Sequence, residues 1–148
     1  WALAEFHSSH PLRSFIPWPL ALPLTILLDD QVVWENTVDK KYRVEISCAD
    51  DITQPDHVLK IVLHGKDSSH TKIDADNNIV ADSSLQFSNF IADDIDITQP
   101  FIENAVYKHN FNGTGPDTED KFFGEMGCNG DVEFTFTTPF CLWLLEKM

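Results

Sequence analysis

The chain has 148 residues, of which 24 are acidic and 10 are basic, and its formal net charge is −14. This length suits one domain, and a hydrophobic content of 43% supplies enough core material to exclude a wholly disordered chain. An acidic surface repels phosphate backbones and anionic lipids, so we expect neither nucleic acid nor a membrane as a partner.

The sequence of the N-terminal part of the chain predicts an irregular arm. Residues 15–28 have the length of a signal-peptide core, but three prolines interrupt them. The stretch is too short and too kinked to span a bilayer. We therefore expect a single domain over residues 1–148, in which residues 1–20 form an irregular N-terminal arm.

Short runs of alternating apolar and polar residues, bounded by Gly, Pro, Asn and Asp, fill the rest of the chain. This alternation is typical of half-buried strands, because successive side chains point to opposite faces of a sheet. No long helical period separates the runs, which favours two packed antiparallel sheets. In chain order, strands are predicted at residues 22–28, 31–38, 42–48, 57–65, 84–91, 101–111 and 131–138.

Two short signals complete the predicted fold. The pair Asp29–Asp30 indicates a tight hairpin between the first two strands. Near the C-terminus, Pro139 can start a helix, and Leu142, Leu145 and Glu146 follow at helical spacing. We predict an all-β fold, an antiparallel two-sheet β-sandwich of jelly-roll type, with a short C-terminal helix that covers a sheet edge.

One phrase occurs twice in the chain, as ADDITQP at residues 49–55 and as ADDIDITQP at residues 92–100. Each copy follows a predicted strand, and each ends in Gln-Pro, which cannot continue a central strand. The sequences that flank the copies do not match, so a duplicated domain is not supported. We interpret each copy as a turn. The alternative is that the two copies share an acidic rim that binds a cation or ligand.

Oxygen-rich side chains at alternate positions mark residues 74–78. Asp74, Asp76 and Asn78 resemble the start of a calcium loop, but Ile79 and Leu85 stand where such a loop needs glycine and a bidentate glutamate. The plain interpretation is a β-hairpin turn, because Asp and Asn tolerate left-handed backbone angles.

Calcium remains the alternative for these acidic segments. If the chain binds a cation, we expect calcium, because the segments offer oxygen ligands and no sulfur. The predicted site brings Asp74, Asp76 and Asn78 together with the second acidic phrase. That phrase contributes Asp93, Asp94 and Asp96.

Aromatic residues give a physical case for carbohydrate binding. A pyranose ring offers an apolar face to Trp or Tyr, and its hydroxyl pairs suit Asp and Asn. The candidate ligand-binding residues are Trp34, Tyr107 and Trp18, although a Trp in a β-sandwich more often belongs to the core. No nucleophile elbow, phosphate loop, dinucleotide fingerprint or cysteine-histidine signature is present, so we expect no enzyme.

The C-terminal third carries a resemblance. Its H-x-F-N-G, G-C-N-G and T-P-x-x-x-W-L-L-E segments resemble small proteins of phages and marine metagenomic sequence. Residues 64–97 look like the same group and more loosely resemble jelly-roll carbohydrate-binding modules. The resemblance implies a jelly roll in a virion or sugar-recognition setting, and it carries no catalytic residues. The matching residues are His109, Phe111, Asn112, Gly113, Gly127, Cys128, Asn129, Gly130, Thr138, Pro139, Trp143, Leu144, Leu145 and Glu146.

Two functions are therefore in competition. The first is a non-catalytic module that binds carbohydrate. The alternative is a structural or interaction protein of a phage or virus particle, virion-associated and in contact with a viral or host protein surface. A row of exposed aromatic side chains on a concave face would favour the first function, and an aromatic-free face with a long unpaired edge strand would favour the second.

Overall fold

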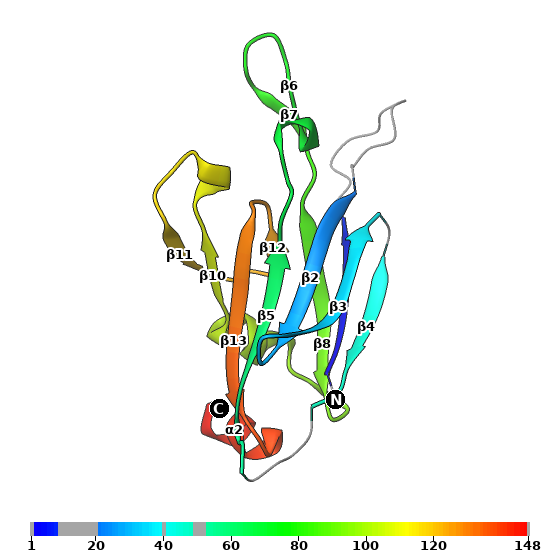
Figure 1. Cartoon of the computed structure of the whole chain (residues 1–148), viewed down its shortest axis with the longest axis vertical. Helices are drawn as coiled ribbons and strands as arrows, with labels where there is room; N and C mark the ends of the chain where they lie inside the picture. Colours follow the sequence, from blue (N-terminus) through cyan, green and yellow to red (C-terminus); the bar gives the residue numbers. More distant parts are fainter. Residues whose placement is uncertain (1, 9–20, 40, 49–52, 148) are drawn as a thin grey trace.

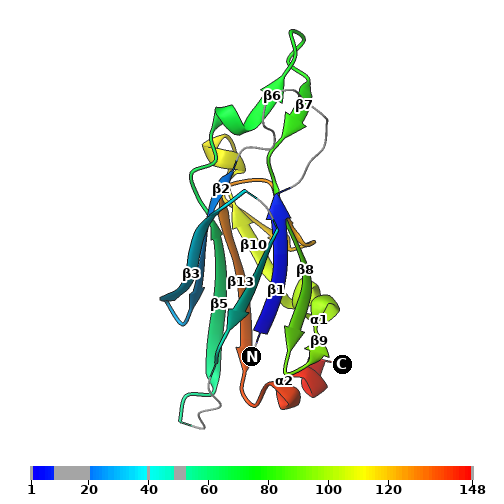
Figure 2. The ribbon, with the colours of Figure 1, turned by 90° about the vertical axis from the view of Figure 1, so that its right-hand side faces the viewer.

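The computed structural model describes residues 2–8, 21–39, 41–48 and 53–147, with the backbone alone for residues 2–8. Two antiparallel sheets pack face to face, as predicted, in a β-sandwich of jelly-roll type (Figures 1 and 2). The five-stranded sheet has the order β12 (Glu125–Met126), β8 (Leu85–Ala92), β1 (Ala2–Ser8) and β4 (Tyr42–Ile46), and β9 (Ile95–Asp96) also pairs with β8.

The second sheet carries the candidate functional site. Its six strands have the order β11 (Thr118–Lys121), β10 (Val106–His109), β13 (Gly130–Thr137), β5 (Asp56–Leu63), β2 (Leu22–Leu28) and β3 (Gln31–Val38). A separate hairpin of β6 (Thr71–Ile73) and β7 (Ile79–Asp82) extends beyond the sandwich at one end (Figure 1). The helices are α1 (Thr98–Asn104), α2 (Phe140–Lys147) and the 3-10 turns η1 (Ser68–His70) and η2 (Phe111–Gly113).

The core follows the predicted alternation. In β13, Phe134 and Phe136 are fully buried while Thr135 between them is exposed. In the neighbouring β5, Leu59 and Ile61 are buried and lie opposite Phe134 and Val132. Residues that lie directly opposite in paired strands share one face, so this face of the sheet forms one wall of the core.

The predicted hairpin and terminal helix are confirmed. Asp29 and Asp30 form the turn between β2 and β3 with φ angles of 51° and 65°, the left-handed values that a two-residue hairpin loop requires. The helix α2 buries Trp143, whose ring lies edge-on to Phe134 with 5.2 Å between the centroids. It therefore covers the end of β13, which is an inner strand, and not a sheet edge as expected.

Two predicted boundaries are wrong. Residues 2–8, assigned to an irregular arm, form β1 between β8 and β4 in the five-stranded sheet, and residues 9–20 lie outside the described part of the chain. The strand predicted at 101–111 begins only at Val106, because residues 98–104 form α1. Phe101 of this helix is buried and stacks on Phe90 with 4.0 Å between the ring centroids, which explains its apolar pattern.

The second acidic phrase combines a turn with a helix start. Asp93 and Asp94 form the left-handed turn between β8 and β9, as the turn interpretation expects. The Oδ1 atom of Asp96 then accepts a hydrogen bond from the backbone nitrogen of Thr98 at 2.9 Å. Pro100 lies in the first turn of α1, where a missing N–H costs nothing. Residues 49–52 of the first copy lie outside the described residues.

None of the helices found in the described residues is long and apolar enough to cross a membrane.

Candidate functional site

Trp34 lies on the inner side of its strand. It is opposite Ile26, which is buried in the core, so its ring points toward the second sheet. There the ring meets Tyr42 of β4 edge-on, with 5.6 Å between the centroids. Trp34 thus closes one side of the sandwich between β3 and β4, and only part of its surface faces solvent. This packing does not support its predicted role as a carbohydrate platform.

Tyr107 is a core residue as well. Only 8% of it is exposed, its hydroxyl donates to the Cys128 carbonyl, and the Cys128 backbone nitrogen donates to the same hydroxyl at 3.0 Å. Burial raises the pKa of the Tyr107 hydroxyl to about 12. A buried ring with an occupied hydroxyl offers no surface to a sugar, so the structure does not support Tyr107 as a ligand contact. Trp18 lies outside the described residues.

The first acidic loop is the predicted hairpin turn between β6 and β7. The Oδ1 atom of Asp74 accepts hydrogen bonds from the backbone nitrogens of Asp76 and Asn78, each at 2.9 Å, and Asn77 has a left-handed φ of 62°. The hydrogen bond from Asn78 is the main reason that the pKa of Asp74 is lowered. The carboxylate of Asp74 therefore holds the turn together.

The structure does not bring the two acidic loops together. Asp74, Asp76 and Asn78 lie in the turn of the β6–β7 hairpin, whereas Asp93, Asp94 and Asp96 lie around β9, at the other end of the molecule (Figure 2). Within residues 21–39, 41–48 and 53–147, no group of three or more His, Cys, Asp or Glu side chains could hold a metal ion. The residues of the joint site predicted from the sequence are thus not brought together, and Asp74 and Asp96 each hold their own local backbone.

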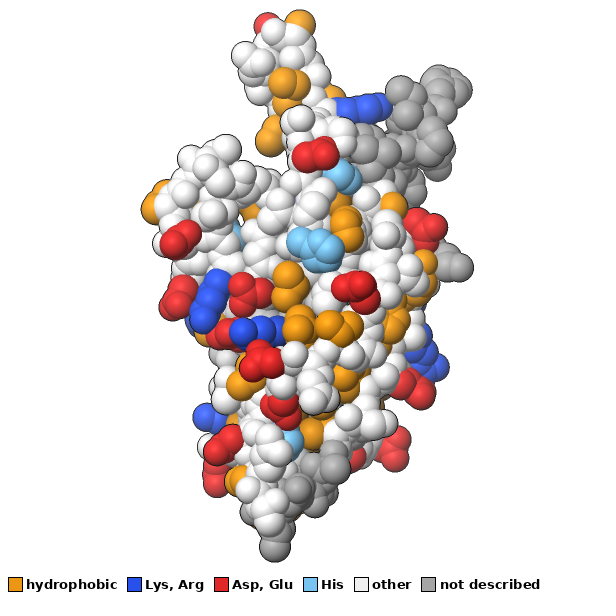
Figure 3. Space-filling model, viewed as in Figure 1, with side chains coloured by type: hydrophobic (Ala, Val, Ile, Leu, Met, Phe, Trp, Pro, Cys, Tyr) orange, Lys and Arg blue, Asp and Glu red, His pale blue; other side chains and the backbone are white. Residues whose placement is uncertain are grey.

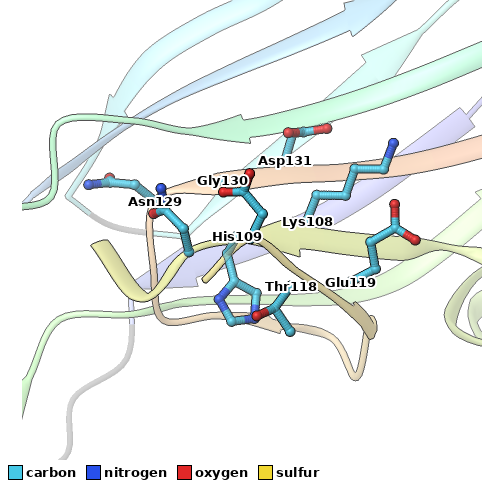
Figure 4. A pocket seen from close by; sticks show the side chains of 9 residues that line it. Lys108, His109, Thr118, Glu119, Asn129, Gly130 and Asp131 are labelled. Carbon is cyan, nitrogen blue, oxygen red and sulfur yellow. The ribbon is translucent and has the colours of Figure 1, made fainter. Parts of the chain in front are cut away.

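A cleft at one end of the six-stranded sheet is the best candidate for a functional site (Figure 4). It lies where β10 ends and β11 and β13 begin, and we call it the terminal cleft. Its volume of about 670 Å³ falls in the usual range for small-molecule sites. The lining residues are Lys108, His109, Asn110, Asp117, Thr118, Glu119, Asn129, Gly130 and Asp131.

Close backbone packing forms the floor of the terminal cleft. A Cβ atom at Gly130 would lie 2.1 Å from the Lys108 carbonyl oxygen, so only glycine lets β13 approach β10 this closely. The neighbouring Asn129 is held from two sides. Its side chain exchanges hydrogen bonds of 2.8 Å with the backbone of Lys66, and its backbone nitrogen donates to Asn112 Oδ1 at 2.7 Å. The floor is therefore fixed before any ligand arrives.

The wall formed by β13 carries a carboxylate that has no close partner. The Asp131 carboxylate forms no hydrogen bond or ion pair with any described residue, although the residue is only partly exposed. Burial and the nearby negative charge of Glu133 raise the pKa of Asp131, and Lys60 and Lys108 lower it less. A partly desolvated carboxylate without a partner gains when a ligand donates a hydrogen bond to it.

The ammonium group of Lys108 already forms an ion pair. Its ammonium lies 2.7 Å from Oε2 of Glu133, and this contact is the main cause of the lowered pKa of Glu133. The carboxylates of Asp117 and Glu119, by contrast, accept no hydrogen bond from other described groups. The free groups of the terminal cleft are thus mostly hydrogen-bond acceptors, which suits a ligand that is rich in hydroxyl or amino donors.

An aromatic ring stands beside the terminal cleft. Phe111 is 45% exposed, and its ring lies edge-on to His109 with 4.7 Å between the centroids. His109 itself lines the cleft and is held by Asp120, whose Oδ2 atom lies 2.7 Å from its Nε2. An apolar ring next to hydrogen-bond acceptors is the combination expected for a sugar contact. Phe111 was part of the sequence resemblance but not of the predicted site.

The broad outer face of the six-stranded sheet has no aromatic side chain among the described residues. The strand registers place two rows of residues across this face, on which Figure 3 shows hydrophobic, basic and acidic side chains intermixed. This composition does not match the aromatic row expected for carbohydrate binding on a sheet face. One row is Glu35, Thr25, Val62, Asp131, Lys108 and Glu119, and the other is Val32, Leu27, Lys60, Glu133, Val106 and Lys121.

Comparisons with known proteins give one structural likeness. No protein-family model matches the chain, and no curated protein matches it. Among solved structures, the chain is similar to one described as "vCBM60 in complex with galactobiose", with 9% sequence identity and a TM-score of 0.49. The match covers 90% of this chain and 95% of that chain. The resemblance to phage and marine metagenomic proteins stays a prediction.

Proposed function

We propose that this protein is a non-catalytic module that binds carbohydrate, and that the sugar occupies the terminal cleft. The observation that carries the proposal is the pairing of free acceptors with an exposed ring. Asp117, Glu119 and Asp131 offer carboxylates to sugar hydroxyls, and Phe111 offers an exposed apolar ring against His109, which also lines the cleft.

The charge of the site narrows the ligand class. Three carboxylates line the terminal cleft, and the Lys108 ammonium is paired with Glu133. A sulfated or uronic-acid sugar would meet repulsion from these groups, in a chain whose net charge is −14. A neutral sugar, whose hydroxyls donate hydrogen bonds to carboxylates, fits the cleft best.

The test is a binding screen with the full chain. We expect a neutral oligosaccharide from a panel of gluco-, xylo-, manno- and galacto-configured sugars, galactobiose included, to bind in calorimetry. The double variant Asp117→Ala/Glu119→Ala should lose most of this affinity, because it removes acceptors from the cleft. Asp76→Ala, in the β6–β7 turn and outside the lining of the cleft, is the matched control and should bind as the wild type does.

Two results would overturn the proposal. Absence of binding to every sugar in the panel would remove the carbohydrate assignment. Release of new reducing ends from a bound oligosaccharide would show that the protein is an enzyme, and the non-catalytic part of the proposal would then be wrong.

Two observations favour the alternative, an interaction protein: the outer face of the six-stranded sheet carries no Phe, Tyr or Trp among the described residues, and the same sheet has an exposed edge strand. In the described part of the chain, β3 forms an edge of the six-stranded sheet along eight residues, and Val32 on it is 58% exposed. Edge strands can pair with a strand of another protein. Substituting Val32 by Lys would block such pairing, and a complex or oligomer that disappears in this variant would support the alternative.

A further inference from the structure

A second hollow lies on the outer face of the same sheet. Asp30, Lys60, Glu133 and Thr135 are among its lining residues, and its volume is about 380 Å³. We call it the hairpin hollow, because Asp30 belongs to the turn between β2 and β3. The carbohydrate assignment made above for the terminal cleft does not use this hollow.

The two hollows adjoin along β13. Asp131, Glu133 and Thr135 alternate along this strand, so their side chains point to the same outer face. Asp131 lines the terminal cleft, and the next two residues of this face line the hairpin hollow. One strand thus forms part of the wall of both.

A group of ion-paired side chains, Lys108, Glu133 and Lys60, lies between the two hollows, and we call it the divider. Lys108, which lines the terminal cleft, lies 2.7 Å from Glu133, which lines the hairpin hollow. On the other side of Glu133, the ammonium of Lys60 lies 3.4 Å from its carboxylate. Lys60 also lies 4.0 Å from Asp30, so the two lysines face two carboxylates and the divider offers no excess positive charge to an anionic ligand. Figure 3 shows basic and acidic side chains next to one another on this face.

We propose that the ligand is an extended neutral oligosaccharide that occupies both hollows, with one end of the bound segment in the terminal cleft and further sugar units along β13 in the hairpin hollow. The inference rests on the proposed function. From Gly130 to Thr135, the strand covers about 17 Å at about 3.4 Å per residue. This track is longer than one pyranose ring, so a monosaccharide cannot fill both hollows.

The polar groups of the hairpin hollow suit additional sugar units. Thr135 is exposed, and its hydroxyl forms no hydrogen bond with any described residue. The Asp30 carboxylate is 90% exposed and lies only 4.0 Å from the Lys60 ammonium. These groups can exchange hydrogen bonds with hydroxyls of a sugar chain that leaves the terminal cleft.

The experiment measures affinity against chain length. Calorimetry would use the sugar that binds in the panel above, as its disaccharide through hexasaccharide series. We expect the wild-type affinity to rise about tenfold from the disaccharide to the pentasaccharide as the hairpin hollow fills. The double variant Lys60→Met/Thr135→Val removes hydrogen-bonding groups from that hollow and should bind the disaccharide normally without the gain for longer chains.

A matched variant controls for the substitutions themselves. Thr37→Val/Lys121→Met makes the same exchanges on β3 and β11, at exposed residues that line neither hollow, and should keep the gain. Equal wild-type affinity for all chain lengths, or a full gain in the Lys60/Thr135 variant, would overturn the extended site while the proposed function stands. If no sugar binds at all, the proposed function is wrong and this inference falls with it.

Discussion

The Nζ atom of Lys66 lies 2.8 Å from Oδ1 of Asp82, although only 2% of the lysine side chain is exposed. The same ammonium donates a hydrogen bond of 2.5 Å to the carbonyl oxygen of Gly127. Asp82 ends β7, and Gly127 precedes β13 beside the terminal cleft. One buried cation therefore joins the β6–β7 hairpin to the loop that carries the floor of the site.

Removing this cation should destabilise the protein. Lys66→Met leaves the Gly127 carbonyl without this donor and the Asp82 carboxylate with the Thr71 hydroxyl alone, and we expect the free energy of unfolding to fall by about 2–4 kcal/mol. Lys121→Met, at an exposed position of β11, should change it by less than about 0.5 kcal/mol. Urea unfolding of both variants measures this difference. Equal midpoints for Lys66→Met and Lys121→Met would show that the buried ion pair does not stabilise the fold.

Gly130 offers a test of the cleft floor. In Gly130→Ala the new methyl group would lie 2.1 Å from the Lys108 carbonyl oxygen, so β10 and β13 must separate. We expect a loss of about 2–3 kcal/mol in thermal or urea unfolding. Gly127→Ala is the matched control, because nothing lies within 4 Å of a Cβ at that position. If both variants unfold at the same midpoint, the contact between β10 and β13 is looser than described.

Local sequence pattern was sufficient for the longer alternating strands, but not for β1, for the short strands β9, β11 and β12, or for α1. The strands at residues 22–28 and 31–38 are found with the predicted bounds, because their alternation and the Asp29–Asp30 turn are local signals. In contrast, Phe101 continues an apolar run and so resembles a strand residue. Its helical setting depends on contact with Phe90 and Phe134, which lie far away in the sequence.

The candidate site needed the same long-range information. Trp34 and Tyr107 are chemically suitable for a sugar, but only the pairing of strands shows that both rings point inward. The terminal cleft unites residues of β10, β11 and β13, and no motif in the sequence marks Asp117, Glu119 and Asp131 as neighbours. The exposure of Phe111 likewise follows from the η2 turn, not from its residue type.

We expect that calcium does not stabilise the acidic loops. Because Asp74 and Asp96 each hold their own local backbone, at opposite ends of the molecule, millimolar calcium should leave the thermal midpoint unchanged relative to chelator. Differential scanning calorimetry with and without calcium tests this. A rise of several degrees would show that a calcium site exists after all, and Asp74→Asn would then identify the loop.

Asp29 should contribute to the acid sensitivity of the fold. Its Oδ2 atom lies 2.6 Å from Nδ1 of the buried His57, and its Oδ1 atom accepts a hydrogen bond from the Val58 backbone nitrogen at 2.9 Å. Burial alone would raise the pKa of Asp29, but the hydrogen bonds from His57 and Val58 outweigh it, so the pKa lies below the usual value of 3.8.

The sign of the pH effect follows from this lowered pKa. A carboxyl group with a lower pKa in the folded state stabilises the fold above about pH 4, and this contribution disappears as the pH falls through the folded-state pKa. Asp29→Asn keeps the left-handed turn but cannot ionise, so it should lose less stability than the wild type between about pH 4 and pH 2. The difference should stay below about 1 kcal/mol, because 30% of the Asp29 side chain is exposed. Asp30→Asn, at a side chain that is 90% exposed, is the matched control. Parallel pH profiles of urea unfolding for wild type and Asp29→Asn would show that the contact with His57 does not lower the pKa.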